Sequence, residues 1–163
     1  MIYGTDDEVV LANAEELANL VIHRPANAND GPFLLNSWLK SYARHRDSLF
    51  YAQVSKETYF TKHHKAIIGL LGNSTVTMAV NKDDQEQILG WACYQNLDDK
   101  DVLHYIYVKH SLRGFGVGTG LLAYATPTEK PIEVSHITPS GLALWRANFD
   151  STPKLDPYLV FGI

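Results

Sequence analysis

A glycine-rich turn over residues 113–120 is the part of the sequence best suited to chemistry. Its glycines occupy alternate positions from Gly114 to Gly120, after the apolar run 102–108. The first N–H groups of a helix have no partner inside the helix, and the helix dipole places partial positive charge there. Glycine leaves such groups unshielded by a Cβ atom. If the turn opens a helix, it is therefore a ready site for a phosphate or pyrophosphate.

Two common phosphate motifs do not fit this turn. The dinucleotide-binding pattern needs glycines at i, i+2 and i+5, and the third position falls on threonine or leucine here. A Walker A loop needs Gly-Lys-Ser/Thr, which the sequence lacks. The pattern that fits is Arg-x-x-Gly-x-Gly, formed by Arg113, Gly116 and Gly118. The alternative interpretation is that these glycines only let a strand and a helix pack closely.

Hydrophobic periodicity predicts the elements that position the turn. Apolar residues at helical spacing predict two helices before the turn, and the turn itself opens a third. The predicted helices cover 32–45, 58–71, 114–125 and 140–148. The predicted strands cover 9–11, 20–23, 75–80, 88–94, 102–108, 132–137 and 155–161, and the polar run 81–87 is predicted to be a hairpin loop.

The run 102–108 is apolar at nearly every position, which suits a central strand buried on both faces. About 23 residues separate it from the strand at 132–137, enough for a parallel, right-handed β-α-β crossover over 102–137. The upstream strands have hairpin-length connections and should be antiparallel. The prediction is an α+β, or mixed α/β, fold, with a central mixed sheet of about six to seven strands flanked by about four helices.

Composition bounds the remaining possibilities. The 163 residues are predicted to form one domain, 1–163, with an acidic N-terminal extension over 1–18. Lys and Arg total 14 and Asp and Glu total 18, so the net charge of −4 gives no global reason to bind nucleic acid or anionic lipid. The single cysteine, Cys93, excludes an internal disulfide and a cysteine-rich zinc site. Without a long apolar run or a signal-peptide start, we expect a cytoplasmic protein without a membrane segment.

The Arg-x-x-Gly-x-Gly pattern of Arg113, Gly116 and Gly118, directly after a strand, resembles the pyrophosphate-binding signature of the GNAT acyltransferase superfamily. The order of elements over 20–161 also resembles that family. The stretches LLNSWLKSY, HHKAIIGLL, GWACY and HYIYVK are similar to small acetyltransferase-like proteins encoded by bacteriophages. The resemblance implies transfer of an acetyl group from acetyl-CoA to a primary amine by direct attack, without a metal. It leaves the amine, small molecule or protein, and a homodimer open.

The resemblance also implies where acyl-CoA would bind. It would lie in a wedge between the strand before the turn and the next parallel strand. The backbone of Ile106 and Val108 would bind the pantetheine arm. The amides that would hold the pyrophosphate are those of Arg113, Gly114, Phe115, Gly116, Gly118 and Thr119.

The sequence departs from the family at two catalytic positions. Where many members carry a glutamate on the strand, this chain has Val102, and His104 shares its face by strand alternation. The near-neutral pKa of histidine makes His104 the preferred base, although a packed strand histidine is the open alternative and a bulge would change the alternation. Where many relatives carry a tyrosine that protonates the thiolate, this chain has Trp145, which cannot serve as an acid. The candidate acids are Tyr105, Tyr107, Tyr124 and Tyr158.

Other chemistry-bearing residues have less specific patterns. His63 and His64 are adjacent on a predicted helix and cannot chelate one ion from the same face. Cys93 is more consistent with packing than with a nucleophile, and Ser135 and His136 lack a Gly-x-Ser-x-Gly motif. The basic residues Lys40, Arg44, His45, Arg46, Lys62 and Lys65 would form a patch if the first two helices pack side by side.

Three functions follow from these observations. The first is the acetyl-CoA-dependent N-acetyltransferase described above. The second is a GNAT-fold binding module that has lost catalysis and docks on a partner, for example a host protein of a phage. The third is a nucleic-acid base modifier, which the acidic charge balance disfavours.

Overall fold

The computed structural model describes residues 14–43 and 54–162. Within those residues the chain forms five α-helices and a six-stranded mixed sheet in the order β1-β2-β3-β4-β5-β6. The helices are α2 (Ala14–Leu20), α3 (Gly31–Ala43), α5 (Lys56–Asn73), α6 (Val117–Ala125) and α7 (Pro139–Asn148). The strands are β1 (Val21–Pro25), β2 (Thr75–Asn81), β3 (Asp84–Asn96), β4 (Asp101–Val108), β5 (Ile132–Val134) and β6 (Lys154–Leu155). The strand predicted at 9–11 lies outside the described residues.

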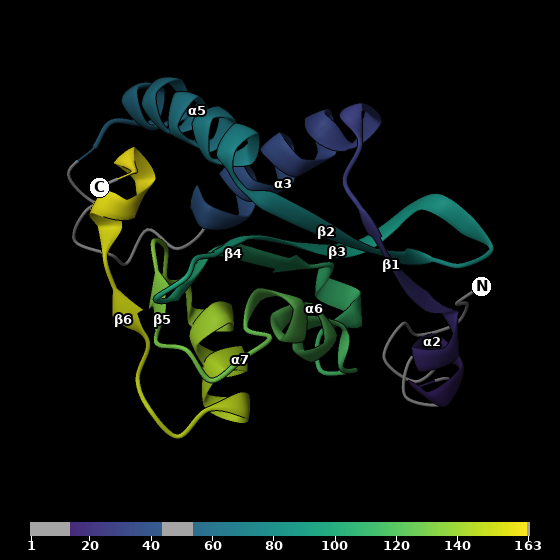
Figure 1. Cartoon of the computed structure of the whole chain (residues 1–163). Coiled ribbons are helices and arrows are strands. Elements are labelled where there is room, and N and C mark those ends of the chain that lie inside the picture. The colour runs from purple at the N-terminus through teal and green to yellow at the C-terminus, as the bar shows by residue number, and fades with distance from the viewer. Residues whose placement is uncertain (1–13, 44–53, 163) are drawn as a thin grey trace.

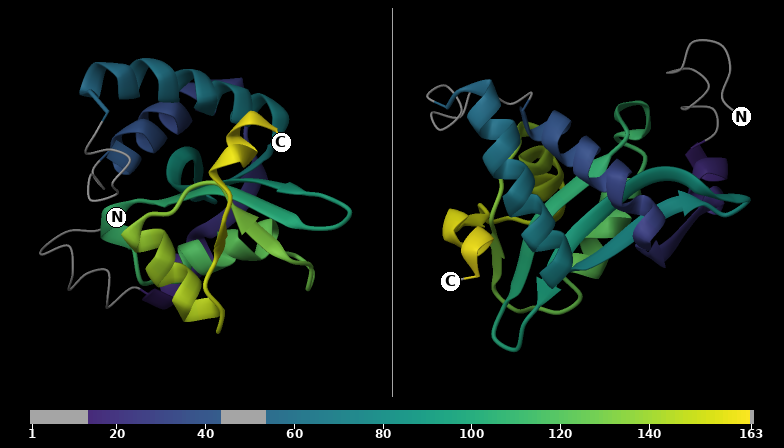
Figure 2. Two further views of the ribbon diagram at one scale, coloured as in Figure 1. Left: turned by 90° about the vertical axis from the view of Figure 1, so that its left-hand side faces the viewer. Right: turned by 90° about the horizontal axis from the view of Figure 1, so that it is seen from above.

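The sheet separates two helical layers. Helices α3 and α5 cover one face, and α6 and α7 cover the other (Figures 1 and 2). Strands β1 to β4 are antiparallel, whereas β4, β5 and β6 are parallel. The predicted mixed sheet and the β-α-β crossover are therefore confirmed. The aromatic residues Trp38 and Trp91 centre the core on the α3/α5 face, and Leu121 of α6 packs on the other.

Helix α2 belongs to the segment that the sequence indicates as an acidic extension. Its residue Leu17 is buried against Leu89 of β3 and Leu112 of the short 3₁₀ helix η2 (His110–Leu112). A fully exposed tail would bury no such side chain. Part of the predicted extension therefore packs onto the domain.

Two predicted strand ends are wrong. The strand predicted at 155–161 pairs only through Lys154 and Leu155, because Asp156 then caps a 3₁₀ helix, η3 (Pro157–Phe161). A proline at the first helical position has no N–H to give to a sheet and is preset for a helical turn. The strand predicted at 132–137 ends at Val134, where it leaves β4. The hairpin loop predicted at 81–87 is shorter, because β3 begins at Asp84.

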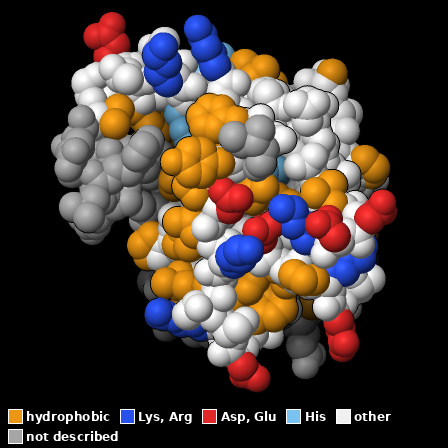
Figure 3. Space-filling model, turned by 60° about the vertical axis from the view of Figure 1, so that its left-hand side comes forward, with side chains coloured by type: hydrophobic (Ala, Val, Ile, Leu, Met, Phe, Trp, Pro, Cys, Tyr) orange, Lys and Arg blue, Asp and Glu red, His pale blue; other side chains and the backbone are white. Residues whose placement is uncertain are grey.

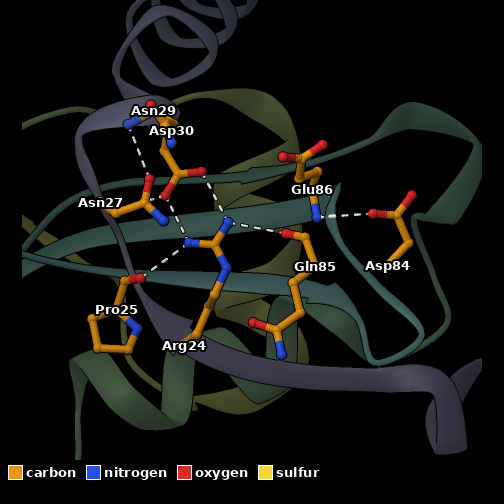
Figure 4. A network of polar contacts seen from close by, with 8 residues as sticks. All are labelled: Arg24, Pro25, Asn27, Asn29, Asp30, Asp84, Gln85 and Glu86. Atoms are coloured by element: carbon orange, nitrogen blue, oxygen red, sulfur yellow. Dashed lines mark hydrogen bonds and ion pairs between the residues drawn. The ribbon is translucent and has the colours of Figure 1, made fainter.

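An arginine–carboxylate pair fixes the path from β1 into α3 (Figure 4). The Arg24 guanidinium donates to both carboxylate oxygens of Asp30, with N–O distances of 2.7 and 2.9 Å. It also donates to the carbonyl of Gln85 at the start of β3, and the Asn27 N–H donates to the Asp30 carboxylate. Asp30 is buried, and the hydrogen bonds from Arg24 hold the pKa of its carboxyl below the ordinary value of 3.8 against the opposing effect of burial. The pair thus joins the end of β1 and the turn before α3 to the distant start of β3.

Replacing Asp30 by Asn should lower the free energy of unfolding at pH 7 by about 2 kcal/mol, because the Arg24 guanidinium would lose its charged partner. A depressed folded-state pKa means that the carboxylate stabilises the fold above its unfolded pKa and that this contribution is lost as pH falls through the folded pKa. Urea unfolding of wild type and variant should therefore differ at neutral pH, and the difference should shrink as pH falls below 3.8 and vanish below the folded pKa of Asp30. The exposed Asp83→Asn is the control, and a difference that persists in acid would contradict this role.

Candidate functional site

The strands β4 and β5 form a fork. They pair only from Asp101↔Ile132 to Leu103↔Val134, and the last bond runs from the Ser135 N–H to the Leu103 carbonyl at 3.2 Å. Across β3 and β4 the register shifts: Tyr105 lies opposite Cys93 and Leu103 lies opposite Tyr94, so His104 has no partner. His104 is thus a β-bulge at the branch point of the fork. Beyond it, β4 continues without β5.

The open edge of β4 presents backbone groups to this fork. The Lys109 N–H donates to the Leu89 carbonyl of β3. Because polar groups of alternate residues point to opposite sides of a strand, those of Ile106 and Val108 face away from β3. The Arg113 Nε–H donates to the Val108 carbonyl at 3.2 Å. The sequence-predicted residues Ile106 and Val108 therefore lie on the open side of the fork.

A cavity of about 420 Å³ joins this edge to the start of α6. It is bounded on the other side by α7, including Ser140 and Leu144. Except for Phe115, the residues predicted to bind the acyl donor line it: Ile106, Val108, Arg113, Gly114, Gly116, Gly118 and Thr119. Phe115 instead packs against the cluster of Leu17, Leu89 and Leu112.

The start of α6 has the geometry of an anion site. Gly114 and Gly116 have φ angles of 87° and 90°, and Gly116 caps the helix without a side chain. The first bond of the helix runs from the Gly120 N–H to the Gly116 carbonyl, so the preceding N–H groups have no helical acceptor. The Arg113 amide is the exception among the predicted donors, because it donates to the His110 carbonyl at 3.3 Å.

A second, smaller cavity of about 40 Å³ lies inside the fork. It shares Ile106, Gly141 and Leu144 with the larger cavity, so the two are neighbours along one path. Apolar side chains of all the surrounding elements line it, among them Leu122 of α6 and Val134 of β5. His104, His136 and Thr138 add polar groups to these apolar walls at the branch point.

His104, the preferred base, is fully buried. Its Nδ1 lies 2.8 Å from the Ser135 Oγ, its Nε2 lies 3.1 Å from the Gln95 Oε1, and burial lowers its pKa to about 4. These contacts agree with the alternative that the sequence left open, in which His104 is a packed strand histidine. Direct contact of His104 with an amine stays a prediction, and its burial disfavours it.

Tyr105, a candidate acid, is also buried. Its hydroxyl lies 2.8 Å from the Ser41 Oγ, its ring stacks on Trp38 at 5.0 Å, and burial raises its pKa above the ordinary value. An acid role for Tyr105 stays a prediction. Trp145 donates its indole N–H to the Ser151 carbonyl, which agrees with a structural role.

The structure brings in residues that sequence reasoning did not place in the site. His136 lines the fork cavity, and its Nε2 lies 3.0 Å from the Nε2 of His63 on α5. Ser135 connects His136 to His104. Their place in the sequence could have indicated this role, because Ser135 and His136 directly follow a parallel strand and ligands bind near the carboxyl ends of parallel strands in α/β sheets.

The remaining candidates have other roles or lie elsewhere. Burial raises the pKa of the Cys93 thiol to about 12, which removes it as a nucleophile. Among the residues that the structure describes, no cluster of three or more His, Cys, Asp or Glu could hold a metal ion. No helix in the described segments is long and apolar enough to cross a membrane. Of the predicted basic patch, Lys40, Lys62 and Lys65 are exposed, while Arg44, His45 and Arg46 lie outside the described residues.

A mixed sheet with a forked central strand and a glycine-capped helix at the fork defines the acyltransferase type of α/β fold. Residues 34–129 match the acetyltransferase (GNAT) family, so the chain belongs to this family. The resemblance inferred from Arg113, Gly116 and Gly118 is thereby confirmed at the level of the family. No curated protein matches the chain.

Solved structures share this fold. The Bacillus subtilis protein YycN has a TM-score of 0.62 and 14% identity, over 81% of this chain and 93% of that one. A ribosomal-protein-alanine N-acetyltransferase from Brucella melitensis has a TM-score of 0.54 and 16% identity, over 81% and 93%. A predicted acetyltransferase from Clostridium acetobutylicum, determined with acetyl-CoA, has a TM-score of 0.50 and 16% identity, over 82% and 92%. At these identities the likeness concerns the fold.

Replacing Gly116 by Ala should lower the free energy of unfolding by about 1–2 kcal/mol, because alanine disfavours the left-handed conformation at this cap. The matched control is Gly69→Ala in the middle of α5, where an added Cβ meets nothing within 4 Å. That control should raise stability by about 0.5–1 kcal/mol. Chemical denaturation measures both variants, and a Gly116→Ala protein as stable as wild type would contradict the assigned conformation.

Proposed function

We propose that the protein is an N-acetyltransferase that transfers the acetyl group of acetyl-CoA to a primary amine by direct attack. The observation that carries the proposal is the cavity of about 420 Å³ that connects the start of α6 to the open edge of β4. An anion site at one end and unpaired strand groups at the other suit a diphosphate with an amide-containing arm. The cytoplasmic location, the phage origin and the homodimer stay predictions.

The donor set fits the phosphate end of acetyl-CoA. Backbone N–H groups at the start of a helix bind anions without basic side chains, so the net charge of −4 is no objection. The left-handed Gly114 and Gly116 turn the chain around this point, and an added Cβ at either would meet nothing within 4 Å, so the space beside them is open. Arg113, which lines the cavity, adds one positive charge.

The strand edge fits the arm of the donor. The backbone groups of Ile106 and Val108 can pair with amides as a neighbouring strand would. At the branch point, an N–H of this edge can donate to the acetyl carbonyl oxygen. Such a donor, fixed before the reaction, stabilises the negative charge that develops when the amine attacks.

A catalytically weak binding module is the second candidate. Among the described residues that line the two cavities, none is a carboxylate. Val102 is buried, so the departure from the family pattern leaves an apolar side chain there. This reading predicts acetyl-CoA binding without acetylation of any amine.

Replacing Thr119 by Glu should weaken acetyl-CoA binding about tenfold or more, because the new carboxylate would repel the diphosphate. Thr119 is exposed in the first turn of α6, where the helix dipole favours an acidic residue. The Thr119→Glu variant should therefore keep its fold. The control Thr119→Gln has a similar shape without the charge. Calorimetry with acetyl-CoA measures all three proteins.

If the wild-type protein neither binds acetyl-CoA nor is stabilised by it at millimolar concentration, the proposed function is contradicted, since a ligand of the folded state must raise the melting temperature. Equal affinities of the Glu and Gln variants would contradict the assignment of the phosphate end to α6. Binding without CoA release in the presence of primary amines would favour the binding module.

A further inference from the structure

A continuous line of hydrogen-bonding side chains runs through the base of the fork. The Nε2 atoms of His63 and His136 are 3.0 Å apart, and the Nδ1 of His136 lies 2.8 Å from the Ser135 Oγ. The same Oγ lies 2.8 Å from the Nδ1 of His104, whose Nε2 lies 3.1 Å from the Gln95 Oε1. The line therefore connects α5, β5, β4 and β3.

The Gln95 end of this line determines which atom donates in each of its hydrogen bonds. The Gln95 amide nitrogen donates to the Asn73 carbonyl, so the amide oxygen faces His104 and the His104 Nε2 must be the donor. A neutral imidazole donates from one nitrogen only, so the His104 Nδ1 accepts the one proton of the Ser135 hydroxyl.

The same rule applies beyond Ser135. Its oxygen can then only accept, which makes the His136 Nδ1 a donor and the His136 Nε2 an acceptor. His63 accordingly donates from Nε2, so its Nδ1 is the unprotonated nitrogen at the α5 end of the line.

The His63 end of the line lies on the opposite face of the sheet from the larger cavity. His136 lines the fork cavity, whereas His63 belongs to α5 on the opposite face from α6 and α7. His63 is half-buried on α5. Hydrophobic side chains cover much of the molecular face in Figure 3, with charged residues between them. His136 contributes the fork-facing end of the pair, so an amine that uses His63 has to enter the fork from the α5 side.

We propose that the His63–His136 pair is the proton acceptor for the amine, an inference that rests on the proposed acetyl transfer. The amine nitrogen forms a C–N bond to the acetyl carbon, and the C–S bond breaks with its electron pair leaving on the CoA sulfur. The proton lost by nitrogen joins the pair at the Nδ1 of His63. It then passes to solvent, and the thiolate takes a proton from solvent.

The surroundings of the pair keep both rings unprotonated at neutral pH. Burial lowers the pKa of His63 to about 4, and burial followed by the neighbouring histidines lowers that of His136 well below its ordinary value. Among the described residues, the rings that face the pair are Trp38 and Tyr42 of α3, Tyr59 of α5, and Tyr105 and His104 of β4, and the Ser135 hydroxyl bonds to His136. A proton on one ring converts the bond between the two rings into a charge-assisted one.

The test compares His63→Gln with the adjacent His64→Gln. Glutamine can still donate to the His136 Nε2 but cannot accept the amine proton, whereas His64 lies outside the line. With acetyl-CoA and an alanine-initiated peptide, spermidine or butylamine as the probe amine, kcat of His63→Gln should fall about tenfold or more, with the KM for acetyl-CoA unchanged. In His136→Gln, kcat should also fall about tenfold or more, because His63 would lose its partner in the pair. His64→Gln should match wild type.

The pH profile of kcat separates chemistry from packing. Its acid limb should shift in His63→Gln and stay in place in His64→Gln, since only the first removes a titrating group of the pair. Nitrogen-15 NMR of the unliganded protein should show Nε2–H on His63 and His104 and Nδ1–H on His136. The opposite tautomers, or equal kcat and pH profiles for both variants, would overturn the inference while leaving acetyl transfer intact. A wild-type protein that binds acetyl-CoA but acetylates no probe amine would overturn the transferase function and the base role together.

Discussion

The parting of β4 from β5 is the constraint on which the rest of the site depends. A strand in the middle of a sheet normally has both edges paired, because buried N–H and C=O groups need partners. Here pairing to β5 stops at Leu103, and the bulge at His104 lies at that point. Arg113 occupies one carbonyl of the open edge, and the remaining groups of Ile106 and Val108 face a cavity. The fold therefore carries a strand edge that a ligand can complete.

The two faces of the sheet provide different environments around this edge. On the α6/α7 face, glycines and small apolar residues let backbone groups approach a ligand. On the α3/α5 face, stacked aromatic rings and three linked histidines fill the space. Neutral imidazoles can be buried because each bonds to its neighbour, whereas an isolated charge would be costly there. The fork is the place where the two environments meet.

Much of the fold was accessible from local pattern. Periodicity predicted α3 and α5, and the apolar run at 102–108 with a long crossover predicted a parallel β4–β5 pair. The ends of β5 and β6 were not accessible, because they depend on where neighbouring strands diverge and on the cap that Asp156 makes. The Arg113–Thr119 turn was predicted from the spacing of Arg113, Gly116 and Gly118 after a strand. The packing of Phe115 elsewhere and the hydrogen bond of the Arg113 amide were not predicted, because only the turn geometry decides them.

The sequence by itself determined the glycine-rich turn and the central strand, and its single cysteine excluded an internal disulfide, since each of these follows from residue type and short-range spacing. Only the tertiary structure decided which histidines matter. His63, His136 and His104 are far apart in the chain and meet because α5 packs over the fork while the bulge turns His104 toward Ser135 and Gln95. Hydrogen bonds between such distant residues depend on the packing of the whole sheet, and no local pattern encodes them.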